Sequence, residues 1–135
     1  MPYSLPLLSV LFAAIPLAAI AQSAKPALYT ADQAGRGAAI YSQSCAACHG
    51  SQLEGTAAPA LKGSIFGEMA AAQSLTAQTL LDVIANTMPQ SDPGSLKPED
   101  NAAVTAYILQ QNGYPAGAAA LANGAAGMSD AKITP

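Results

Sequence analysis

A chain of 135 residues has the length of about one domain, and its 51% hydrophobic and 10% charged content excludes a disordered polymer. The formal net charge is −3, and only five lysines and arginines are scattered along the chain, which excludes a surface built to bind nucleic acid. With two Phe, five Tyr and no Trp, the side chains alone underfill a core, so we expect a bound apolar cofactor to complete it.

The N-terminal segment has the pattern of a secretory signal peptide. Residues 5–21 form an apolar run that ends in Ala19-Ile20-Ala21, with small side chains at the two positions that a signal peptidase recognises. We therefore expect residues 1–21 to be removed and the chain to be exported to the periplasm. An uncleaved membrane anchor is the alternative, because the first residues contain no Lys or Arg. Pro16 argues against that anchor, since a spanning helix needs about 20 uninterrupted apolar residues.

We divide the mature chain into three parts. A short linker spans residues 22–29, a domain spans 30–114, and an Ala- and Gly-rich tail spans 115–135. The domain has no strand pattern and no internal repeat, so the predicted fold class is all-α with one site. Whether the tail packs against the domain or stays separate from it is an open question at this point.

The first predicted helix spans residues 31–42. Thr30 and Gln33 form a capping box, in which the Thr30 hydroxyl accepts from the Gln33 amide and the Gln33 side chain reaches back to the helix start. Gly35 and Gly37 lie inside this helix, where each costs about 1 kcal/mol relative to alanine. We therefore expect both glycines to permit the close approach of another helix.

The rest of the domain predicts one long loop and two more helices. The loop has no sustained periodicity, so we expect it to wrap around a bound group. The second helix has a threonine cap and an apolar stripe, and the third begins with a proline and two acids, which favour a first turn. In chain order these elements are the loop 45–74, the helix 77–87 capped by Thr76 and ended by Met88-Pro89, the turn 90–96, and the helix from Pro98 to the stop at Asn112-Gly113.

One short motif predicts a covalently attached haem. Cys45-Ala46-Ala47-Cys48-His49 has two thiols at the spacing that adds across two vinyl groups of one porphyrin, followed by an imidazole for the iron. A structural zinc site would need about four ligands, whereas the chain has two Cys and one His. A disulfide or redox couple is the other alternative, but no βαβ pattern accompanies the motif. We therefore expect one haem c, held by Cys45 and Cys48, with His49 as an axial ligand.

The second axial ligand is expected to be a methionine, whose thioether suits haem iron. Of the four methionines, Met1 would leave with the signal peptide, Met69 lies in the predicted loop and Met128 lies in the tail. Met88 ends an apolar helix and precedes Pro89, which favours an extended chain at Met88. We therefore predict Met88 as the ligand. A different methionine, or an iron without a sixth protein ligand while Met88 only fills the core, is the alternative.

At these residues the sequence resembles the class I monohaem c-type cytochromes, over about residues 30–114. It looks most like the cytochrome subunits and domains of quinoprotein or flavin dehydrogenases. The matching residues are Gly37, Tyr41, the run Cys45 to Gly50, Pro59-Ala60-Leu61, Met88-Pro89, Val104 and Tyr107. The resemblance implies a cytochrome c-like fold of about three main helices around one haem, in which the first and last helices pack together. It also implies that the backbone carbonyl of Pro59 accepts a hydrogen bond from His49.

The predicted function is electron transfer. With both axial positions filled, the iron has no open site for a substrate, so we expect a carrier that passes single electrons and is not itself an enzyme. The expected partners are a dehydrogenase donor and an oxidase or cytochrome acceptor, with a membrane only if the signal segment is uncleaved. A peroxidase or gas sensor with an open distal side is the rival hypothesis, although the chain has no second His to act there. The residues expected to line the haem pocket are Pro59, Leu61, Phe66, Leu80, Leu81 and Ile84.

The surface around the haem edge is predicted to be uncharged. The nearby charged side chains reduce to Glu54, Lys62 and Asp92, which are too few and too mixed to steer a partner over more than about 8 Å at physiological salt. We therefore expect docking to depend weakly on salt, and the alternative is that the acidic surface as a whole steers toward a basic partner. The predicted docking residues are Ala46, Ala47, Gly50, Ser51, Gln52, Pro89, Gln90, Ser91 and Gly94.

Overall fold

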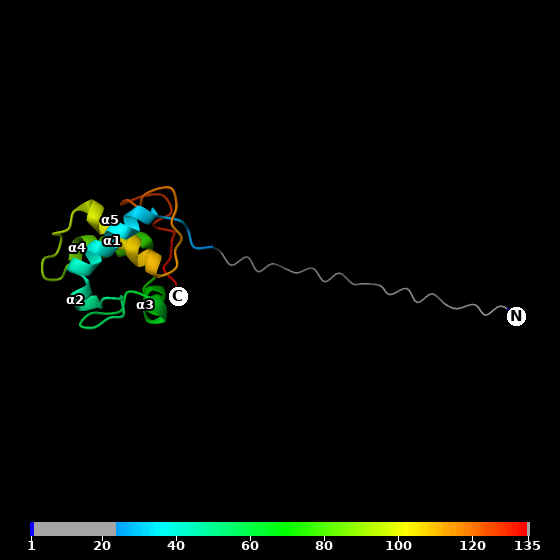
Figure 1. The fold of residues 1–135 in the computed structure, drawn as a ribbon, viewed down its shortest axis with the longest axis horizontal. Helices are drawn as coiled ribbons and strands as arrows, with labels where there is room; N and C mark the ends of the chain where they lie inside the picture. The colour runs from blue at the N-terminus through cyan, green and yellow to red at the C-terminus, as the bar shows by residue number, and fades with distance from the viewer. Residues whose placement is uncertain (2–23, 135) are drawn as a thin grey trace.

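The computed structural model describes Met1 and residues 24–134, and within these residues the regular elements are all helices. The predicted all-α class is therefore confirmed. The predicted signal peptide, apart from Met1, and the start of the predicted linker lie outside the described residues. No helix in the described part of the chain is both long and apolar enough to cross a membrane. In chain order the helices are α1 (Ala31–Ser44), α2 (Ala46–His49), α3 (Gly63–Ala72), α4 (Ala77–Thr87) and α5 (Pro98–Gln111) (Figure 1).

The packing of α1 against α5 forms the centre of the fold. A Cβ atom on Gly37 would lie 1.9 Å from the backbone oxygen of Ala103 in α5, so this close contact requires glycine. Beside it, the rings of Tyr41 and Tyr107 are tilted by 53° with centroids 5.4 Å apart, an arrangement that aromatic pairs favour. The prediction for Gly37 is thus confirmed. The prediction for Gly35 is wrong, because a Cβ atom there would meet nothing within 4 Å.

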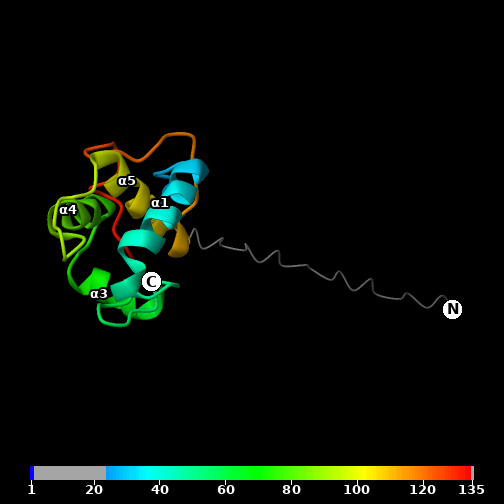
Figure 2. The same cartoon turned by 60° about the vertical axis from the view of Figure 1, so that its left-hand side comes forward.

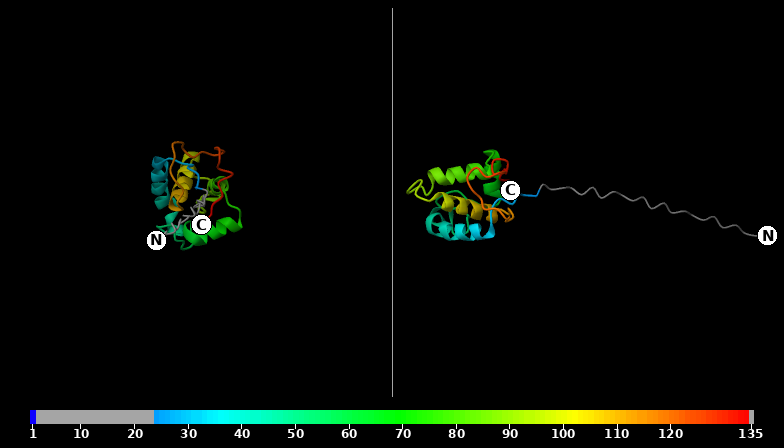
Figure 3. Two further views of the ribbon diagram at one scale, coloured as in Figure 1. Left: turned by 90° about the vertical axis from the view of Figure 1, so that its right-hand side faces the viewer. Right: turned by 90° about the horizontal axis from the view of Figure 1, so that it is seen from above.

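α4 packs against α5, so that α5 lies between α1 and α4 (Figure 3). The predicted bounds of α4 are confirmed, and so is its cap. The Thr76 hydroxyl accepts from the Thr79 amide at 3.1 Å, and the Thr79 hydroxyl oxygen accepts from the Thr76 amide at 2.7 Å. This reciprocal pair satisfies two amides at the start of the helix. The apolar stripe of α4 faces the core.

α3 shows that the predicted loop over residues 45–74 is interrupted. The segment contains the single turn α2 and the ten-residue helix α3, which Figure 2 shows at one end of the molecule. Phe66, Gly67 and Ala70 form the buried side of α3. Because glycine and alanine provide most of its apolar positions, the helical period is weak in the sequence and α3 was not predicted.

The C-terminal tail packs over the helices (Figure 2), which answers the open question about its placement. Leu121, Met128 and Ile133 are buried with the core of the domain. Backbone hydrogen bonds join Ala131 to the start of α4, where its carbonyl accepts from the Ala77 amide at 2.9 Å. The tail therefore extends the core at the N-terminal end of α4.

The buried side chain of Gln33 in α1 holds the tail at Leu121. Its Nε2 donates to the Leu121 carbonyl at 2.8 Å, and its Oε1 accepts from the Leu121 amide at 2.7 Å. The predicted capping box is consequently only half formed. The Thr30 hydroxyl does accept from the Gln33 amide at 3.2 Å, but the Gln33 side chain is engaged by the tail and does not reach back to the helix start.

Candidate functional site

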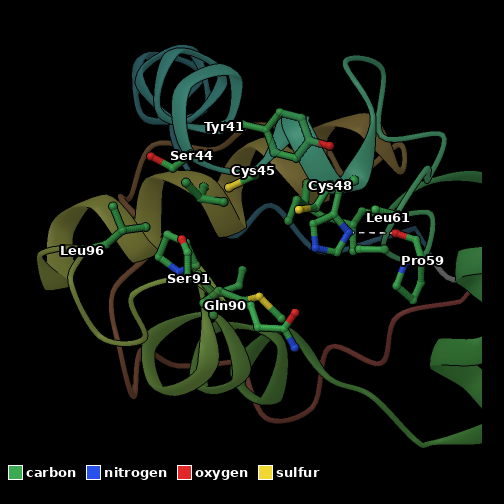
Figure 4. A pocket seen from close by; sticks show the side chains of 17 residues that line it. Tyr41, Ser44, Cys45, Cys48, Pro59, Leu61, Gln90, Ser91 and Leu96 are labelled. Atoms are coloured by element: carbon green, nitrogen blue, oxygen red, sulfur yellow. Dashed lines mark hydrogen bonds between the residues drawn. The ribbon is translucent and has the colours of Figure 1, made fainter.

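A cavity of about 600 Å³ lies between α1, the loop after α2, the end of α4 and α5 (Figure 4). This volume is within the range of about 300–1,000 Å³ that is usual for bound small molecules and cofactors. The lining includes Cys45, Cys48, His49 and Met88. Among the described residues that line it there is no Asp, Glu, Lys or Arg. The cavity thus combines two thiols, one imidazole and one thioether in surroundings without a formal charge.

The attachment motif forms one further helical turn beyond α1. The Cys45 amide donates to the Tyr41 carbonyl at 2.9 Å and ends α1, and the Cys45 carbonyl then accepts from the His49 amide at 2.9 Å. Because residues three and four apart lie on the same side of a helix, this turn brings Cys45, Cys48 and His49 to one wall. Figure 4 shows the two cysteine sulfur atoms on the same side of the cavity. Burial raises the pKa of the Cys45 thiol, and the nearby Cys48 raises it further.

His49 donates a hydrogen bond to the loop below it. Its Nδ1 lies 2.8 Å from the Pro59 backbone oxygen, as the dashed line in Figure 4 marks. A carbonyl oxygen only accepts, so Nδ1 holds the proton and Nε2 keeps a lone pair that can bind a metal. The hydrogen bond implied by the resemblance is therefore present, and it selects the imidazole tautomer suited to a metal ligand.

The loop that presents Pro59 is held by carbonyls of the motif itself. The Cys48 carbonyl accepts from the Ala58 amide at 2.9 Å and from the Thr56 hydroxyl at 2.7 Å. The His49 carbonyl accepts from the Gly55 amide at 2.8 Å. These bonds return the chain toward the imidazole and fix one side of the loop.

Two polar side chains brace this loop, and sequence reasoning missed both roles. The Tyr41 hydroxyl donates to the Gly50 carbonyl at 2.7 Å. Burial, with Cys45 as a further cause, raises the pKa of Tyr41 to about 12, so this donor stays protonated at physiological pH. The Glu54 carboxylate accepts from the Gln52 amide at 2.7 Å, and backbone amide hydrogen bonds hold the pKa of Glu54 below its usual value.

Met88 lies on the wall formed by the end of α4. It is the C-cap residue of that helix, with φ −121° and ψ 153°, the extended conformation expected before a proline. Met69 lies in α3 and Met128 is buried in the tail, and neither lines the cavity. Met88 is therefore the methionine that shares the cavity with His49.

The predicted pocket residues divide into two groups. The cavity meets α4 only at its last turn, so residues one turn earlier in that helix pack in the core instead. α3 likewise turns its buried side toward the core. Pro59, Leu61 and Ile84 line the cavity, whereas Phe66, Leu80 and Leu81 are buried in the core and do not line it. Contact of all six residues with the haem stays a prediction.

Other lining residues were not predicted as pocket residues. Val104 and Ile108 of α5 provide apolar wall, and Leu96 adds to it before that helix begins. The helical spacing of Val104 and Ile108 was visible in the sequence, but it indicated only a buried face.

Among the predicted docking residues, Pro89, Gln90 and Ser91 line the cavity, whereas Gly50 is buried and cannot contribute to a docking surface.

The chain is similar to known proteins both in sequence and in fold. A family model described as cytochrome c oxidase, cbb3-type, subunit III matches residues 32–108, which is more than half of the sequence. Among solved structures, the sulfane dehydrogenase SoxCD from Paracoccus pantotrophus is similar, with 22% identity and a TM-score of 0.57 over 93% of this chain and 68% of that chain. At this identity the similarity shows a shared fold. No curated protein matches the sequence.

Proposed function

The chain belongs to the family described as cytochrome c oxidase, cbb3-type, subunit III, and we propose that it is a single-electron carrier with His49 and Met88 as the axial ligands of its haem. It is a monohaem c-type cytochrome with an all-α cytochrome c fold, and it binds one haem c covalently. We assign the two thioether bonds to Cys45 and Cys48. The observation that supports these assignments is the meeting of two thiols, an imidazole and a thioether in one uncharged cavity.

The residues around the cavity have separable roles in this proposal. Bound haem supplies an iron that changes between two oxidation states. The Pro59 carbonyl keeps the proton of His49 on Nδ1, which leaves Nε2 available as a ligand. Leu61, Ile84 and Val104 exclude water from the site and lower its effective dielectric constant. These features favour a stable coordination shell that exchanges electrons without opening.

We propose that the chain is a carrier and catalyses no reaction by itself. In a distal catalytic site a polar acid or base is expected above the iron. The described lining residues include no carboxylate and only one imidazole, that of His49, which is hydrogen-bonded to the Pro59 carbonyl. The rival function is that of a peroxidase or a gas sensor with an open iron.

Ligand binding distinguishes these functions. Cyanide is added to the oxidised holoprotein and carbon monoxide to the reduced holoprotein, and absorption spectra are recorded over time. We expect both spectra to stay unchanged at first, because Met88 fills the sixth position. Immediate binding of either ligand in the wild type would favour the rival function.

We further propose a periplasmic location and a dehydrogenase as electron donor, with an oxidase or another cytochrome as acceptor. The apolar run at residues 5–21 and its small terminal residues support export. The resemblance to cytochrome subunits of quinoprotein or flavin dehydrogenases supports the donor class. The mass of the protein purified from periplasmic extract tests the first point, since removal of residues 1–21 is expected. Pull-down from the same extract followed by mass spectrometry identifies the donor.

Docking at the mouth of the cavity is proposed to depend weakly on salt. The lining residues nearest the Met88 side are Pro89, Gln90 and Ser91, all uncharged. Without a ring of like charges, a partner is not steered over long distances. Stopped-flow reduction by the native partner, from low to high ionic strength, measures this property. A fall in the second-order rate of more than about tenfold would instead favour steering by the acidic surface as a whole.

A further inference from the structure

The side chain of Asn112, at the end of α5, connects that helix to the loop over residues 50–62, which carries Pro59. Its Nδ2 donates to the Leu61 carbonyl at 2.9 Å, and its Oδ1 accepts from the Gly63 amide at 3.3 Å. The same Nδ2 donates to the Ile108 carbonyl at 2.8 Å. Leu61 and Ile108 both line the cavity. The Asn112 amide therefore joins two walls of the cavity that are distant in sequence.

The contact with Gly63 also fixes the start of α3. The first amides of a helix have no partner within the helix, and the N-cap residue Lys62 provides no side-chain cap. The Asn112 oxygen supplies the missing acceptor from another helix. As a result, α3 begins at a point that is fixed relative to the end of α5.

These contacts lie next to the carbonyl that orients His49. Pro59 has no amide hydrogen, so the position of its carbonyl depends on hydrogen bonds made by its neighbours. On the side toward α3 that neighbour is Leu61, whose amide donates to the Leu53 carbonyl at 2.9 Å and whose carbonyl accepts from Asn112. Loss of the Asn112 amide removes one of these two restraints and releases the start of α3.

We propose that Asn112 is a positioning residue for the His49 ligand. By fixing Leu61 and Gly63, it keeps the Pro59 carbonyl at hydrogen-bonding distance from His49 Nδ1. This inference rests on the proposed function, in which His49 binds the iron. An acceptor at Nδ1 makes the imidazole a stronger donor to the metal, which favours the oxidised iron. Loosening the loop is therefore expected to raise the reduction potential.

The test uses the haem-loaded full chain with Asn112→Ala. Solvent exchange of the His49 Nδ1 proton is followed by NMR, and the reduction potential is measured by redox titration. We expect proton exchange to accelerate about tenfold, which corresponds to about 1.4 kcal/mol, and the potential to rise. The sulfur-to-iron absorption band should remain, because the Met88 wall is not altered. Asn123→Ala is the matched control, since Asn123 lies exposed in the tail and bonds only to Gln78 among the described side chains. It should change neither quantity.

The outcomes separate a positioning role from a merely structural one. Wild-type exchange and potential in folded, haem-loaded Asn112→Ala would overturn the proposal and leave Asn112 as a helix cap. If that variant does not fold, Asn112→Asp decides by the same measurements, because it keeps an acceptor for Gly63 but loses the donor to Leu61. A failure of the proposed function is visible earlier, since the wild type would then lack a His49 resonance shifted by the iron, and the inference would fail with it.

Discussion

The loop over residues 50–62 and the tail over residues 115–134 are both irregular and rich in Gly and Ala, yet they are held in different ways. The loop is bonded mainly to residues near it in sequence, such as Gly55 to the His49 carbonyl. The tail is held by residues far from it in sequence, both through side chains, as with Gln33 and the backbone of Leu121, and through backbone hydrogen bonds, as with the Ala77 amide and the Ala131 carbonyl. The comparison teaches that similar composition permits either a local turn around a site or a long-range cover over a core. Variants in the two segments should therefore affect different properties.

The largest effect is expected from removing the thiols next to the loop. In the double variant Cys45→Ser and Cys48→Ser, no thioether can form, so haem staining of the polypeptide on a denaturing gel should be lost completely. Either single variant should retain at most one bond to the porphyrin. Met128→Ala, a variant of the tail, should keep full staining. Full staining of the double variant would show that the attachment sites lie elsewhere.

Two methionine variants should separate the site from the tail most clearly. Met88→Ala is expected to abolish the sulfur-to-iron band of the oxidised protein, lower the reduction potential and allow cyanide to bind. Met128→Ala should leave that band unchanged but lower the free energy of unfolding by about 2–5 kcal/mol, because it removes a buried side chain. Absorption spectra and urea denaturation measure the two effects. Loss of the band in Met128→Ala or Met69→Ala would move the ligand assignment.

A smaller effect is expected from Gln33→Ala, which removes the anchor of the tail. The buried amide and carbonyl of Leu121 would lose their partners, at a cost of about 1–3 kcal/mol in the free energy of unfolding. The reduction potential should not change, because Gln33 does not line the cavity. Gln43→Ala is the matched control, since Gln43 is an exposed glutamine of the same helix. A shift in potential for Gln33→Ala would mean that the tail and the site are coupled.

The smallest effect is expected from Glu54→Gln in the loop. The pKa of Glu54 is lowered from 4.5 by the amides of Glu54 and Gln52, so the folded protein favours the ionised carboxylate. The resulting stabilisation is present above the pKa of the unfolded chain and is lost as the pH falls through the lower pKa of the folded state. The variant should therefore be slightly less stable than the wild type at neutral pH and equally stable in strong acid. Urea denaturation at both pH values measures this difference, and a gap that widens in acid would contradict the assignment.

Local sequence was sufficient for the attachment motif and for several helix ends. The thiols and the imidazole must lie within one helical turn to meet one porphyrin, so their chemistry is visible in five consecutive residues. The ends of α4 were also predictable, because the signals lie at the ends themselves. Thr76 caps the start of the helix by hydrogen bonds to Thr79, and Met88-Pro89 stops its other end. The same holds for α5, which begins at Pro98 and ends before Asn112.

Tertiary structure decided what depends on partners far along the chain. Gln33 can cap its own helix or bond to the tail, and the choice was made by Leu121, which is separated from it by 88 positions. The assignment of Leu80 to the core rather than to the cavity was decided by where α5 and the loop meet α4. The sequence indicated only that Asn112 ends α5, and its hydrogen bond to the start of α3 depends on how the two helices pack. In each case a short segment permits several hydrogen bonds or contacts of similar energy, and only the packing of distant elements selects one of them.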